Sequence, residues 1–219
     1  MQLVKESAAR RSLRIRPSES NPAPMIFDRD MRALLLTAAG SGSGTTTCAL
    51  ILANELASSS HEPVLLIDAS LSAHNLTHRF GLEQSPGFLD LMFSGGGMAI
   101  QDCIVKNAGH RRPFDVMPIG VYLRHGERID PGELQELLAR LTERYRFVVV
   151  DGDALYANQD TLAIGSQADG VVLIVRNEHT RWEVAQAALQ RLRQAEARVI
   201  GSIFNARKFY LPKIIYDNL

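Results

Sequence analysis

A run of small and hydroxyl-bearing residues between two apolar segments constrains this chain more than any other feature. Residues 34–37 (LLLT) are typical of a strand, residues 38–47 (AAGSGSGTTT) of a loop, and residues 48–56 (CALILANEL) of a helix. Where a glycine-rich loop joins a strand to a helix, backbone N–H groups converge and the helix dipole favours an anion. The sequence therefore predicts a phosphate-type loop.

The loop departs from the pattern G-x-x-x-x-G-K-[ST] at its charged position. Thr45 stands where the pattern has lysine. The residues expected to contact a nucleotide phosphate are Gly42, Ser43, Gly44, Thr45, Thr46 and Thr47, and Thr46 also has the hydroxyl expected to bind Mg²⁺. Because the lysine that neutralises phosphoryl charge is missing, we expect at most weak binding of ATP and Mg²⁺.

Length and composition describe an ordinary globular domain. The chain has 219 residues, of which 46% are hydrophobic, and its 24 basic residues balance 24 acidic ones. This balance argues against nucleic-acid binding, which usually goes with a basic domain. The sequence lacks both an apolar run of about 20 residues and an apolar signal core, so we expect a cytoplasmic protein. Two cysteines are too few for a disulfide framework or a zinc site.

The chain divides into three parts. We expect a basic arm and Pro/Ser linker over residues 1–30, an α/β domain over residues 31–207 and a short tail over residues 208–219. Within the domain, near-continuous apolar strands alternate with helices, which predicts a mainly parallel sheet with helices on both faces. The expected strands are 34–37, 64–68, 114–118, 147–151, 170–175 and 198–205, and the expected helices are 48–56, 131–144 and 180–194. The last helix is expected to bury Trp182, Val184, Ala188, Leu189 and Leu192.

Polar residues stand where three of these strands end. Asp68 and Asp151 each follow an apolar run, and Asn205 ends the last strand. Ligands of parallel sheets bind at the carboxyl ends of the strands, where the glycine loop also lies. We therefore expect Asp68 and Asp151 to act as catalytic carboxylates and as Mg²⁺ ligands beside Thr46. An aspartate in such a place can alternatively cap the following helix.

These motifs, in this order, resemble the cytoplasmic domain of bacterial tyrosine autokinases, which are relatives of the MinD/ParA-like P-loop ATPases. The resemblance covers about residues 32–206. It is carried by the loop with residues 64–71 (VLLIDASL), and by residues 78–91, 116–120, 131–134, 145–151, 168–176 and 201–205. It implies a P-loop NTPase fold, and it implies that Asn205 hydrogen-bonds adenine.

The departures from the family fall on charged positions. Thr45 replaces the lysine, Gly40 replaces the signature lysine of the partitioning ATPases, and Ser70 replaces the second acid of a D-x-D. Only Tyr210 and Tyr216 remain in the tail for autophosphorylation. The sequence therefore favours a degenerate member of the family. Four arginines and lysines on neighbouring segments are alternatives for the missing cation: Arg176, Arg181, Arg207 and Lys208.

The resemblance implies a regulatory component of exopolysaccharide or capsule biosynthesis or export. The implied partner is an inner-membrane chain-length regulator or export component, which would place the chain peripherally at that membrane. Arg11-x-x-Arg14 resembles part of the family's oligomerisation motif, which implies a homo-oligomer. Two alternatives stay open: an active ATPase or tyrosine kinase with a substituted cation, and a MinD/ParA-like positioning ATPase.

Overall fold

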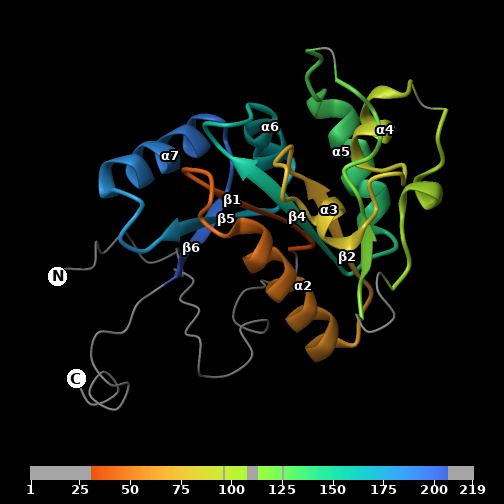
Figure 1. Ribbon diagram of the computed structural model, residues 1–219, viewed down its shortest axis with the longest axis horizontal. Helices are drawn as coiled ribbons and strands as arrows, with labels where there is room; N and C mark the ends of the chain where they lie inside the picture. The colour runs from red at the N-terminus through yellow and green to blue at the C-terminus, as the bar shows by residue number, and fades with distance from the viewer. Residues whose placement is uncertain (1–30, 96, 108–112, 125, 207–219) are drawn as a thin grey trace.

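A six-stranded parallel sheet forms the centre of the molecule (Figure 1). The computed structural model describes residues 31–95, 97–107, 113–124 and 126–206. The arm, the linker, Tyr210, Tyr216, Arg207 and Lys208 therefore lie outside the described residues. The strand order is β3-β2-β4-β1-β5-β6, and every neighbouring pair is parallel. Strand β1, which leads into the glycine loop, therefore lies between β4 and β5.

The elements follow the predicted alternation of strands and helices. The strands are β1 Ala33–Ala38, β2 Val64–Ala69, β3 Asp115–Met117, β4 Phe147–Ala154, β5 Gly170–Arg176 and β6 Val199–Asn205. The helices are α2 Thr45–Ser60, α3 Leu76–Phe80, α4 Phe88–Phe93, the 3₁₀ helix η1 Ile100–Cys103, α5 Pro131–Thr142, α6 Asp160–Gln167 and α7 Trp182–Gln194.

Both faces of the sheet are covered, as the continuous apolar strands predict. Helix α2 covers one face, together with Leu76 of α3. Helices α4, α5, α6 and α7 cover the opposite face. The two-residue period of a strand then divides the side chains of each strand between these two apolar layers. In β1, for example, Leu35 faces the α4–α7 layer, whereas Leu34 and Leu36 face α2.

Helix α7 differs from the sequence prediction in its buried face. Its buried residues are Ala185, Ala188 and Leu192, whereas Trp182 is 65% exposed and Val184 39% exposed. Trp182 is the first residue of the helix. Small alanines make the contact further along. The prediction that Trp182 and Val184 are buried was wrong.

No helix in the described part of the chain is long and apolar enough to cross a lipid bilayer.

Candidate functional site

The glycine loop connects β1 to α2, and two of its residues have a left-handed backbone. Gly42 has φ 72° and Gly44 has φ 87°, a region that favours glycine. Gly44 is the N-cap residue of α2, and no side chain accepts a hydrogen bond from the first turn of that helix. The Ser43 hydroxyl instead donates to the Gly40 carbonyl oxygen at 2.7 Å, which closes the loop on itself. The N-terminal N–H groups of α2 therefore point out of the helix with no side-chain cap.

Asn205 and Arg176 hold the loop from the neighbouring strands β6 and β5. The Asn205 amide nitrogen donates to the Ser43 carbonyl oxygen at 2.9 Å. A Cβ atom at Gly44 would lie 2.1 Å from this nitrogen, so a side chain there is excluded. Arg176 Nη1 donates to the Gly42 carbonyl oxygen at 3.0 Å. Asn205 thus lies at the site as predicted, with its amide group bonded to the loop; its contact with adenine stays a prediction.

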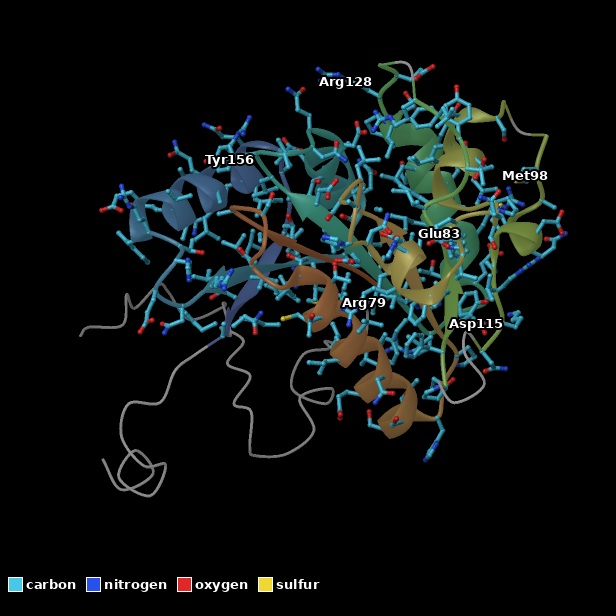
Figure 2. All side chains as sticks on the ribbon, in the orientation of Figure 1. Arg79, Glu83, Met98, Asp115, Arg128 and Tyr156 are labelled. Carbon is cyan, nitrogen blue, oxygen red and sulfur yellow. The ribbon has the colours of Figure 1, made fainter. Side chains whose placement is uncertain are left out.

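Asp151 lies inside β4 and is fully buried. Neither of its carboxylate oxygens has a hydrogen-bond partner among the described residues. Burial is the main cause that raises the pKa of Asp151 to about 8, and the carboxylates of Asp68 and Asp153 raise it as well. The Thr46 hydroxyl and Arg79 of α3, which is labelled in Figure 2, have the opposite effect and lower this pKa. A buried carboxylate without a partner is costly, and buried polar groups left unpaired in this way often mark a functional site.

Asp68, the neighbour of Asp151 in the register of β2 and β4, has both carboxylate oxygens occupied. One accepts a hydrogen bond from the Ser70 N–H at 3.1 Å, and the other accepts from the N–H and the hydroxyl of Thr77 at 2.7 and 2.6 Å. Burial raises the pKa of Asp68 to about 6 against the opposing effect of these hydrogen bonds. The aspartate thus holds the first turn of α3 through Thr77, although the N-cap residue of that helix is Asn75. The role of Asp68 as a catalytic group or metal ligand stays a prediction.

Asp153 is a third carboxylate at this edge that sequence reasoning missed. It accepts hydrogen bonds from the Ser70 hydroxyl at 2.6 Å, the Leu71 N–H at 2.8 Å and the Asn158 amide at 3.2 Å. Ser70, where the family has an acid, is thus paired with an acid supplied by the next strand. The spacing of Asp151 and Asp153 was the available signal, because residues i and i+2 of a strand share a face.

These residues fit a magnesium nucleotide in part. Thr46 and the unpaired Asp151 offer the oxygen ligands that Mg²⁺ prefers, and the loop offers N–H donors for phosphate. The loop lysine, which would supply positive charge to the phosphates, is replaced by Thr45. Thr47 is exposed on the first turn of α2. Among the described residues, no group of three or more histidine, cysteine, aspartate or glutamate side chains could hold a metal.

Cys48, directly after the loop, is not a reactive thiol. It is buried, and burial raises its pKa to about 11, with a further increase from the Asp151 carboxylate. The thiol therefore stays protonated and packs as a small apolar residue.

Comparison with known proteins identifies several tyrosine-protein kinases and an uncharacterized ATP-binding protein of Methanocaldococcus jannaschii among the relatives. The chain is 29% identical over 184 residues to the tyrosine-protein kinase YwqD of Bacillus subtilis, covering 83% of this chain and 75% of the kinase. It is 27% identical to the putative tyrosine-protein kinase EpsB of Ralstonia solanacearum over 82% of this chain, but only 23% of that longer protein. No family model matches the chain.

Solved structures agree with these relatives. The VpsO kinase domain superposes with a TM-score of 0.73 at 29% identity, covering 86% of this chain and 91% of that domain. The cell division protein MinD of Aquifex aeolicus superposes with a TM-score of 0.68 at 22% identity, covering 85% of this chain and 73% of MinD, which shows a shared fold. The chain is thus a homologue of the kinase domains of bacterial tyrosine autokinases, and it has the MinD/ParA-like P-loop NTPase fold.

Proposed function

We propose that this chain is a degenerate tyrosine-autokinase domain that acts by binding rather than by phosphoryl transfer. The observation that carries this proposal is Thr45 at the position of the loop lysine, in a loop whose backbone is otherwise arranged for phosphate. Phosphoryl transfer depends on positive charge that stabilises the transition state, and an uncompensated loss of that charge costs several orders of magnitude in rate. In this proposal, the buried Asp151 is the former Mg²⁺ ligand of a site whose loop lysine is replaced by Thr45.

The biological setting proposed for the chain follows from its homology. Its place would be regulatory, in exopolysaccharide or capsule biosynthesis or export, through contact with an inner-membrane chain-length regulator or export component. Relatedness to bacterial tyrosine-protein kinases supports this setting, and the chain covers 23% of the length of EpsB. A peripheral location at the inner membrane and a homo-oligomer belong to the same proposal.

The decisive experiment measures chemistry in the purified chain. Incubation with Mg²⁺ and ATP should release no phosphate above the background of an Asp151→Ala variant, and no phosphotyrosine should form on Tyr210 or Tyr216. Hydrolysis by the parent chain that Asp151→Ala abolishes would instead establish an active enzyme. Co-purification with a chain-length regulator from the native host tests the proposed setting independently.

One observation favours the alternative of an active enzyme with a substituted cation. Arg176 contacts the loop directly, so a positive charge is present within the phosphate region, although it comes from β5 rather than from α2. If Arg176 supplied the catalytic charge, ATP hydrolysis would be lost in Arg176→Gln and in Asp151→Ala alike.

A further inference from the structure

A cavity on the β5 side of the glycine loop gathers positive charge. Its volume is about 460 Å³, and its lining comprises Gly40, Ser41, Ser43, Arg176, His179, Thr180, Arg181 and Val184. Two arginines and a histidine line it, and no carboxylate does. The loop between β1 and α2 and the start of α7 border this region side by side (Figure 1). The charge pattern is that of a site for an anion.

The fold fixes both arginines at the cavity. Strand β5 pairs with β1, with Ile174 beside Ala38, so Arg176 emerges two residues later alongside the loop. A tight turn follows, in which the Arg176 carbonyl oxygen accepts from the Thr180 N–H at 2.9 Å and the Arg176 N–H donates to the Thr180 hydroxyl at 3.1 Å. This turn returns the chain to Arg181, the N-cap residue of α7.

Arg176 can serve the loop and a ligand together. A guanidinium group has five N–H donors in a planar fork, and the Gly42 carbonyl oxygen takes one of them. The remaining donors suit the oxygens of a phosphate, which arginine binds in bidentate fashion. Arg181 is a second arginine in the lining of the cavity. A cavity of this size with two such groups is large enough for two linked phosphates rather than one.

We propose that this cavity binds a diphosphate group, with Arg176 and Arg181 supplying the charge that Thr45 does not. The inference rests on the proposed function, because it names the anion that a domain without phosphoryl transfer would still bind at this loop. Inorganic pyrophosphate, the diphosphate of a nucleotide and that of a larger ester share this chemistry. A ligand bound here requires no phosphoryl transfer and no metal.

Calorimetric titration of the full chain with inorganic pyrophosphate, without Mg²⁺, tests the proposal. Arg176→Gln and Arg181→Gln should each weaken binding by about tenfold, because each removes a charge-assisted hydrogen bond. Arg176→Lys should retain part of the affinity. Arg140→Gln, which removes an exposed arginine of α5 outside the cavity, should leave binding unchanged.

The outcomes separate this proposal from the previous one. Absence of pyrophosphate binding, or equal affinity in the parent chain, Arg176→Gln and Arg181→Gln, would overturn the diphosphate site. Arg181 is exposed, so Arg181→Gln keeps the test valid should Arg176→Gln unfold. If ADP binds more tightly than pyrophosphate, the diphosphate site is supported and its ligand is a nucleotide. If the two bind equally, the site is supported and it recognises the diphosphate group alone. Because no ATP or Mg²⁺ is present, hydrolytic activity has no bearing on the result.

Discussion

A single buried carboxylate links the charge of this site to the stability of the chain. Burial raises the pKa of Asp151 to about 8, whereas an aspartate in an unfolded chain has a pKa of about 3.9. Between these values the folded protein holds a proton that the unfolded chain has released. The stability that this proton contributes is complete below about pH 4, and it is lost as the pH rises toward about 8.

Asp151→Asn should therefore stabilise the protein at high pH. The variant should gain about 1–3 kcal/mol in free energy of unfolding at pH 8, and the gain should shrink toward pH 4. Urea unfolding at pH 5, 6.5 and 8 measures this. Asp68 also has a raised pKa, about 6, so the decline between pH 4 and 6 should persist in the variant while the decline above pH 6 disappears.

The exposed Asp102→Asn is the matched control, and its pH profile should follow the parent chain. Equal slopes of the free energy of unfolding against pH, for the parent chain and Asp151→Asn above pH 6, would show that Asp151 is ionised at neutral pH. That result would remove the argument that its carboxylate has no positively charged partner.

A single substitution, Thr45→Lys, restores the lysine of the loop pattern. Thr45→Lys should raise the affinity for Mg²⁺-ATP by about tenfold or more, because it adds a charge-assisted hydrogen bond to phosphate at the first residue of α2. Isothermal titration measures it, and Thr45→Met controls for side-chain length. An affinity equal in both variants would mean that the loop backbone no longer accepts a triphosphate.

Sequence reasoning predicted that most residues of the candidate site lie at one edge of the sheet, but not how they are bonded. Thr45, Thr46 and Asp151 follow from the loop pattern and from an apolar strand ending in an acid. The pairing of Ser70 with Asp153 depends on β2 and β4 being neighbours, a fact of tertiary structure that two segments 83 residues apart do not display. For the same reason, the sequence left Arg176 as one of four candidate cations, and only the pairing of β5 with β1 places it on the loop.

At the scale of elements, the connection that follows β3 depends on one glycine. Gly120 has φ 104°, and a Cβ atom there would lie 2.0 Å from Asp90 Oδ2. That oxygen accepts hydrogen bonds from the N–H groups of Gly87 and Val121 at 2.8 and 2.9 Å. Asp90 therefore ties the start of α4 to the segment leaving β3, and only a residue without a side chain fits between them.

Gly120→Ala and Gly126→Ala form a matched pair that separates strain from collision. Gly126 has φ 100° but no atom within 4 Å of its would-be Cβ, so its substitution should cost only the backbone strain, roughly 1–2 kcal/mol. Gly120→Ala should cost about 2–4 kcal/mol more, because the Asp90 hydrogen bonds must also break. Urea unfolding of both variants checks this, and equal losses would mean that Asp90 moves aside freely.

The elements show where a sequence pattern is reliable. Apolar runs predict the strands because both faces of the sheet are covered. Strands β1, β2 and β4 are buried throughout, whereas the edge strand β6 is only partly buried. The pattern predicts α7 but not the whole of its buried face, since Ala185 and Ala188 are buried whereas Trp182 is exposed. Helices α3, α4 and α6 are short, so they contain too few turns for a helical period to be recognised.

At the scale of the whole molecule, the two ends of the parallel sheet differ in how completely their charges are paired. At the amino end, Lys106, Asp115 and Tyr145 form a closed triangle with bonds of 2.7, 2.9 and 2.7 Å. Asp115 is labelled in Figure 2. At the carboxyl end, neither carboxylate oxygen of Asp151 has a hydrogen-bond partner among the described residues, and two arginines line a cavity. The triangle stabilises the fold, whereas Asp151 and the cavity are the groups that we propose to bind a ligand.

This difference predicts where a ligand should change hydrogen exchange. Pyrophosphate at 100 times its Kd should stabilise the native state by about 2.7 kcal/mol, which raises protection in every segment that exchanges by global unfolding. Beyond that uniform gain, residues 40–46 and 176–181 should gain protection through local ordering, because they border the cavity. Residues 105–107 and 115–117 at the opposite end should show the uniform gain alone. Extra protection there, with none around the loop, would place the anion at the Lys106 end and contradict the division of the sheet into a structural end and a binding end.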